Sequence, residues 1–109
     1  MNIVDSLLSV RTEDNREHKY FYRLFSSSFR GNQAFGIEVE RQVVEDGQVI
    51  NIERDDISLI SNDKQKVSKL LDLLYKNQVS PIHLVDVLGE YVDEYVYDFD
   101  RVLELQGVI

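Results

Sequence analysis

The stretch FGIEVERQVVEDGQVINIE, residues 35–53, decides the fold class. Apolar and polar residues alternate from Phe35 to Val43, which is the period-two pattern of a strand with one buried face. Asp46-Gly47 follows, and this pair favours a two-residue type I′ turn because both central positions of that turn need a positive φ. The sequence therefore predicts an antiparallel hairpin here.

The register of this hairpin follows from the turn. A tight turn places Val43 opposite Ile50, and Ile52 then lies on the same face as these two residues. The same register places Glu40 opposite Glu53, a like-charge pair that destabilises a sheet. Two solutions remain open: a neighbouring arginine relieves the repulsion, or the turn is longer than two residues.

An aromatic segment precedes the hairpin. Aromatic residues suit a pleated, half-buried surface, so Lys19–Phe25 predicts the first strand. Tyr22 and Phe21 point to opposite faces, and both faces are expected to be covered. We expect a loop over the polar residues 11–18 and a turn over residues 26–32, where serine, glycine and asparagine gather.

A helical pattern begins after residue 60. Ser61 or Asn62 can cap the helix, and Asn62 with Gln65 resembles a capping box. Apolar residues then recur at helical spacing and predict its buried stripe: Val67, Leu70, Leu71 and Leu74.

A second helix is predicted from Ser80-Pro81, because serine favours the cap position and the missing N–H of proline is not needed in the first turn. It runs towards Gly107, and its apolar positions are spaced three and four residues apart: Val85, Leu88, Val92, Tyr95, Phe99 and Val102. We expect this long helix to extend past the sheet and to offer its apolar stripe to a second copy of the chain.

Strands followed by helices predict an α+β domain: an antiparallel sheet of about three strands with two helices packed on one face. Residues 19–109 are expected to form this single domain, and residues 1–18 an N-terminal extension or short element. A chain of 109 residues has enough length for one hydrophobic core.

Composition narrows the possible functions. The chain has no cysteine, so disulfides and thiolate metal sites are excluded, and its two histidines lie in no metal-binding or catalytic motif. No phosphate-binding glycine loop or nucleophile elbow is present. We therefore expect no catalytic residues, no cofactor and no metal. No signal peptide and no apolar run of about 20 residues is found, so we expect a cytoplasmic protein without a membrane partner.

The formal net charge is −8, which disfavours binding to nucleic acid. The charge is unevenly distributed, since residues 61–80 hold four lysines and two aspartates while residues 81–109 hold seven acids and one arginine. The acids of the last helix recur at four-residue steps between tyrosines. These residues form the candidate partner-binding set: Asp86, Glu90, Tyr91, Glu94, Tyr95, Tyr97 and Asp98.

Three segments together resemble a family of small, uncharacterised bacterial proteins that is common in clostridia. They are Tyr20–Leu24, the strand Phe35–Glu40 with its Gly-Ile-Glu motif, and the helix start Val79–Val87 with its Ser-Pro-Ile-His-Leu motif. The resemblance covers roughly residues 19–93. It implies a bacterial cytoplasmic setting, and because the family has no established activity it implies no site residues.

Three functional hypotheses follow. The first is a non-catalytic interaction or regulatory module whose C-terminal acidic helix binds a basic protein surface or a second copy, as a possible homodimer. The second is an enzyme or small-ligand binder with a carboxylate site that has no sequence motif. The third is an acidic mimic of nucleic acid that binds a basic protein.

Overall fold

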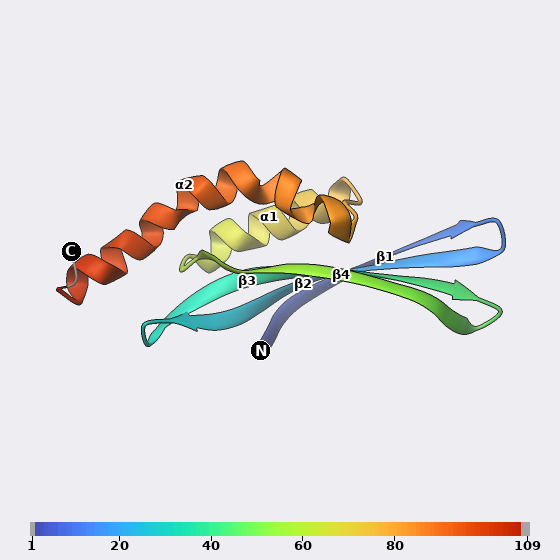
Figure 1. Cartoon of the computed structure of the whole chain (residues 1–109), viewed down its shortest axis with the longest axis horizontal. Coiled ribbons are helices and arrows are strands. Elements are labelled where there is room, and N and C mark those ends of the chain that lie inside the picture. The colour runs from blue at the N-terminus through green and yellow to red at the C-terminus, as the bar shows by residue number, and fades with distance from the viewer. Residues whose placement is uncertain (1, 108–109) are drawn as a thin grey trace.

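Four antiparallel strands form a single meander in the order β1-β2-β3-β4, and two helices follow (Figure 1). The computed structural model describes residues 2–107. The strands are β1 (Asn2–Glu13), β2 (Arg16–Phe29), β3 (Asn32–Glu45) and β4 (Gln48–Ser61). The helical elements are α1 (Lys64–Lys76), the short 3₁₀ helix η1 (Pro81–His83) and α2 (Leu84–Leu105). The predicted α+β class is confirmed, with four strands in place of about three.

Every strand connection is a two-residue turn: Asp14-Asn15, Arg30-Gly31 and Asp46-Gly47. All six of these residues have φ between 50° and 78°. Positive φ at both positions is what a type I′ hairpin turn requires, so the Asp46-Gly47 turn is confirmed. The other two turns have the same geometry.

The loop predicted over residues 11–18 is wrong, because this segment is the Asp14-Asn15 turn with the strand ends on either side of it. Residues 1–18 thus contain a twelve-residue edge strand, β1. The turn predicted over residues 26–32 is also too long, since β2 continues to Phe29. The β1–β2 turn lies beyond the helices (Figure 1), so its polar residues are exposed and resemble a loop in composition.

A β-bulge sets the register of β3 and β4. Val44 lies opposite Val49, but the register then shifts by one residue, and Val43 lies opposite Asn51. The predicted pairing of Val43 with Ile50 is therefore wrong, and Ile52 lies opposite Gln42, on the face away from the helices.

The bulge removes the like-charge pair that the tight register would create. Arg41 lies opposite Glu53, with Nη2 2.7 Å from Oε1, and Glu40 lies opposite Arg54, at 3.6 Å. Opposite charges on facing positions stabilise a sheet, and like charges destabilise it. One inserted residue thus replaces a repulsive pair with two attractive pairs.

The core lies between one face of the sheet and the two helices. Tyr22 and Leu24 of β2 and Ile37 and Val39 of β3 are fully buried on this face. The predicted stripe of α1 is confirmed as buried: Val67, Leu70, Leu71 and Leu74.

The N-cap of α1 differs from the prediction, whereas Ser80 is the N-cap of η1 and Pro81 its first residue, as expected. Asp63 is the N-cap of α1, and its carboxylate accepts hydrogen bonds from the backbone N–H groups of Gln65 and Lys66. The predicted caps Ser61 and Asn62 precede it. In α2, Leu84 is buried and Val85 is 54% exposed, so Val85 does not belong to the buried stripe. The 3₁₀ turn Pro81–His83 changes the phase of the chain before α2 begins.

Gly36 marks a second irregularity, where β3 passes under a bulge of β4. A Cβ atom at this position would lie 2.3 Å from the carbonyl oxygen of Ile57 and 2.6 Å from that of Ser58. Backbone atoms cannot move aside as a side chain can, so this approach requires glycine.

Candidate functional site

The outer side of α2 carries four exposed carboxylates: Asp86, Glu90, Asp93 and Glu94. Residues three, four and seven positions apart lie on the same side of a helix, and we call these four residues the acidic face. Within residues 2–107, none of them takes part in an ion pair of 4 Å or less. The face is therefore open to solvent without an intramolecular counter-charge.

Asp93 was missed in the sequence-based set, although it lies seven residues after Asp86. The predicted set follows the four-residue steps from Asp86 to Glu90 and Glu94, whereas Asp93 lies three residues after Glu90. Helical spacing alone could have identified it.

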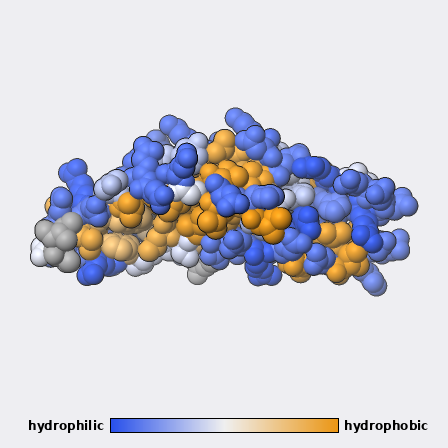
Figure 2. Space-filling view, turned by 45° about the horizontal axis from the view of Figure 1, so that its top comes forward, coloured by the Kyte–Doolittle hydropathy of each residue, from blue (hydrophilic) through white to orange (hydrophobic). Residues whose placement is uncertain are grey.

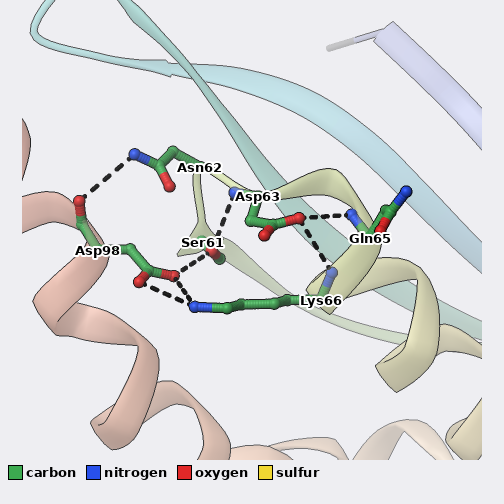
Figure 3. A network of polar contacts seen from close by, with 6 residues as sticks. All are labelled: Ser61, Asn62, Asp63, Gln65, Lys66 and Asp98. Atoms are coloured by element: carbon green, nitrogen blue, oxygen red, sulfur yellow. Dashed lines mark hydrogen bonds and ion pairs between the residues drawn. The ribbon is translucent and has the colours of Figure 1, made fainter.

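Asp98, the last carboxylate of the predicted set, forms polar contacts with other residues of the fold (Figure 3). Its carboxylate lies 3.0 Å from Nζ of Lys66 and accepts a 2.5 Å hydrogen bond from the hydroxyl of Ser61. Its backbone carbonyl also accepts a hydrogen bond from the side chain of Asn62. These contacts join α2 to the end of β4 and the start of α1.

The charges around Asp98 explain its ionisation. Burial alone would raise the pKa of Asp98, but the hydrogen bond from Ser61 and the ammonium of Lys66 outweigh burial and lower the pKa below its usual value. The hydrogen bond and charge of Asp98 in turn raise the pKa of Lys66 despite some desolvation. Both groups are therefore held in their charged forms as a structural pair.

The three tyrosines of the predicted set lie in different surroundings. Tyr95 is half-buried, with its ring 5.0 Å below Nζ of Lys66 and 6.3 Å from the ring of Tyr91. Tyr97 is 71% exposed, beside the acidic face. Tyr97 is therefore the aromatic residue of this set most accessible to a partner, whereas Tyr95 contributes mainly to the packing of α2 on α1.

The C-terminal turns of α2 pack on the sheet. Phe99 is buried with its ring centroid 5.0 Å from that of Phe29, and Val102 is buried beside it. The side chain of Gln106 donates a 2.8 Å hydrogen bond to the carbonyl oxygen of Arg30 in the β2–β3 turn. The expected free apolar stripe is thus largely used by the fold. The C-terminal end of α2 extends past the β2–β3 turn, as predicted, and at the opposite end the sheet extends past the helices (Figure 1).

Hydrophilic side chains dominate the side of the molecule drawn in Figure 2, and hydrophobic ones gather near its middle. Exposed apolar residues of η1 and α2 include Ile82, Val85 and Val96. An acidic surface with exposed apolar residues nearby is suited to contact with protein.

On the sheet face away from the helices, Glu40 is a buried carboxylate at the centre of a second polar network. It lies 3.4 Å from the guanidinium of Arg23 and accepts a 2.7 Å hydrogen bond from Gln42. Burial raises the pKa of Glu40. The hydrogen bond from Gln42 and the nearby Arg23 and Arg54 lower it by more than burial raises it, so the net change in the pKa is downward. This network aligns β2, β3 and β4 and lies apart from α2.

Other binding features are shallow or absent within residues 2–107. One open groove lies along the end of α2 at Tyr97, Arg101 and Glu104, and another lies between β4 and η1 at Arg54 and Ile82. No group of three or more His, Asp or Glu side chains in this range is placed to hold a metal ion. No helix in the same range is long and apolar enough to cross a bilayer.

The motifs behind the family resemblance have structural roles. Gly36 allows the close approach of β4 described above, and Pro81 is buried at the start of η1. The hydroxyl of Tyr22 donates a buried 3.0 Å hydrogen bond to the carbonyl oxygen of Val79, which ties the sheet to the segment between the helices. These residues therefore specify the fold.

Comparison with curated proteins and with solved structures finds no match. A family model does match, and it covers residues 1–94. The expected family coverage from about residue 19 is therefore wrong at its N-terminal end, because β1 belongs to the matched region, while the end near residue 93 is confirmed. The chain belongs to this family, which is described as a family of unknown function (DUF6514).

Proposed function

We propose that this protein is a non-catalytic interaction module whose acidic face on α2 binds a basic segment of a protein partner. The observation that carries the proposal is the exposure of Asp86, Glu90, Asp93 and Glu94 without an ion pair among the described residues. Charges left without a counter-charge on one helix face attract an oppositely charged surface and accelerate its association.

The packing of α2 supports this proposal. Leu84, Leu88, Phe99 and Val102 are buried on the inner side of α2, and the contacts of Asp98 join the same helix to α1 and β4. The carboxylates are thus presented on a helix that is already folded, and binding costs less conformational entropy than it would for a disordered acidic segment.

A charge-matched pair of variants tests the proposal. Glu90→Lys with Glu94→Lys reverses two charges on the acidic face, and Asp55→Lys with Asp56→Lys reverses two exposed charges on β4. Each double variant changes the formal net charge from −8 to −4, since each substitution adds two charge units. The two proteins therefore have the same net charge and differ only in where it lies.

The first measurement is the fluorescence anisotropy of a labelled lysine- and arginine-rich peptide titrated with each protein. We expect the α2 variant to bind roughly tenfold more weakly than the β4 variant, and binding of the unchanged chain to weaken as salt is added. Equal affinities of the two variants would refute a site on α2.

The second measurement is capture of partners from the cells that make the protein, at low and at high salt. We expect a protein that the unchanged chain and the β4 variant retain and the α2 variant does not. A partner that is retained equally by all three proteins, whatever the salt concentration, contradicts the electrostatic mechanism.

A further inference from the structure

The two edge strands of the sheet differ in how they are protected. β4 carries four consecutive charged residues, Glu53–Asp56, and two register shifts interrupt its pairing with β3. Charges and bulges on an edge strand discourage further strand pairing. β1 has no lysine and no proline and carries one register shift near its start, between Ile3 and Asp5. β1 is therefore the edge that is open to another strand.

The side chains of β1 suit a partner strand. On the face away from the helices, Leu8 is 50% exposed and Val10 is exposed to a similar extent. Leu8 lies opposite Phe21 of β2, so apolar side chains continue from the edge into the sheet. A long edge strand of this kind has unpaired backbone N–H and C=O groups and apolar side chains that a neighbouring strand would cover.

The charges of β1 identify that neighbour. Between Asn2 and Thr12 the strand contains two charged residues, Asp5 and Arg11. Both point to the helix side of the sheet, since their partners on β2 are Leu24 and His18. Within residues 2–107 neither makes an ion pair. Two strands related by a twofold axis through Leu8 would place each Asp5 opposite the Arg11 of the other copy.

We propose that β1 pairs with β1 of a second copy, antiparallel and centred on Leu8, to form a continuous sheet of eight strands. A twofold axis perpendicular to a sheet keeps each residue on its own face, so the pairing must centre on a residue. Centring on Leu8 pairs both charges. A centre at Leu7 leaves Asp5 opposite Ser9, and a centre at Ser9 places Asp5 opposite Glu13, a repulsive pair.

This interface and the acidic face of α2 are compatible. α2 contacts β4, which lies at the opposite edge of the sheet from β1. Both acidic faces would remain exposed in the dimer, near its two ends. The test of the dimer is independent of the proposed function, because it involves neither α2 nor a basic partner.

Sedimentation equilibrium of the full chain tests the dimer. We expect a mass of twice 12.7 kDa for the unchanged protein. Asp5→Arg or Arg11→Asp alone should weaken the dimer roughly ten- to hundredfold, because each change replaces two attractive cross-strand pairs with two repulsive ones. The double variant Asp5→Arg with Arg11→Asp should restore it. A monomeric unchanged chain, or a double variant no stronger than the single ones, overturns the proposal.

A matched pair of apolar variants distinguishes the two edges. Leu8→Lys should give a folded monomer, whereas Ile52→Lys on β4, where the side chain is 47% exposed, should leave the dimer intact. Circular dichroism checks that both variants fold. The opposite result would move the interface to β4 and overturn the proposal.

Cysteine cross-linking tests the register even where a variant alters stability, because the chain contains no cysteine of its own. Leu8→Cys should form a disulfide-linked dimer on mild oxidation, since facing residues of antiparallel strands have Cα atoms about 4.5–5.5 Å apart. Val10→Cys should not, because the two copies of this position would lie about 13 Å apart along the strands. Equal cross-linking of both variants, or none at position 8, overturns the proposed register.

Discussion

Replacing Asp98 with alanine should destabilise the fold while leaving the acidic face unchanged. The substitution removes the hydrogen bond from Ser61, which is fully buried, and the ion pair with Lys66. A hydrogen bond to a charged acceptor contributes about 1.5–3 kcal/mol. The ion pair adds about 0–1 kcal/mol, because the Lys66 side chain is 40% exposed and solvent screens the interaction. We therefore expect the free energy of unfolding to fall by about 1.5–4 kcal/mol.

Urea denaturation followed by circular dichroism at pH 7 measures this change. Glu94→Ala is the matched control, because Glu94 is exposed on the same helix and has no ion pair among the described residues. The control should alter the free energy of unfolding by less than about 0.5 kcal/mol. Equal losses in the two variants would refute the structural role of Asp98.

The destabilisation should also depend on pH. Since the pKa of Asp98 is lower in the folded than in the unfolded chain, its charge stabilises the protein above the unfolded value of about 3.9. This contribution is lost as the pH falls through the folded pKa. The difference between Asp98→Ala and the unchanged protein should therefore be constant near neutrality and shrink below about pH 4. A difference that stays constant into strong acid contradicts the assignment.

Two further substitutions, Gly36→Ala and Tyr22→Phe, test contacts of the family motifs, and Gly89→Ala is the control for the first. Gly36→Ala should lower the free energy of unfolding by about 3 kcal/mol, because the added Cβ would lie against two backbone carbonyls. In α2, a Cβ added at Gly89 would meet no neighbouring atom within 4 Å, so Gly89→Ala should raise the free energy of unfolding by up to about 1 kcal/mol. Thermal denaturation of the two variants compares them, and similar midpoints would contradict the close approach. Tyr22→Phe should lose about 1–3 kcal/mol at neutral pH, because the carbonyl oxygen of Val79 loses its buried partner. Burial raises the pKa of Tyr22 to about 12. The stability that Tyr22 gives the unchanged protein is therefore complete below about pH 10 and is lost as the pH rises through the folded pKa. The free energy of unfolding of the phenylalanine variant should depend less on pH in this alkaline range.

Local chemistry predicted much of the fold. The turn at Asp46-Gly47 and the stripe of α1 each follow from residues within a few positions of one another. The β1–β2 turn could have been found in the same way, because aspartate and asparagine tolerate positive φ better than other residues with side chains. The polar composition of its flanks concealed it.

The correct register of β3 and β4 could have been predicted from the charged residues of the two strands. The tight turn predicted the wrong pairing, because turn chemistry cannot reveal an extra residue in a strand. The like-charge pair of Glu40 and Glu53 was the sign of the error. Shifting the register by one residue pairs Glu40 with Arg54 and Arg41 with Glu53, so cross-strand charge matching should be used with turn type.

The candidate site was predicted in part. Helical spacing placed Asp86, Glu90 and Glu94 on one exposed face, as observed. Spacing could not show that Asp98 meets Lys66, because the two residues are 32 positions apart and come together only when α2 packs across the start of α1. A carboxylate in an acidic helix therefore cannot be assigned to a partner until its tertiary neighbours are known.

The three two-residue turns also have a consequence for how the chain folds. Each strand pairs with the next one in the sequence, so the whole sheet can form by closing short loops one after another, at little cost in loop-closure entropy. The contact between Ser61 and Asp98 closes a much longer loop, of 37 positions. The C-terminal half of α2 is therefore expected to dock last during folding and to detach first under mild denaturation. Hydrogen exchange would show its amides losing protection while those of β2 and β3 remain protected.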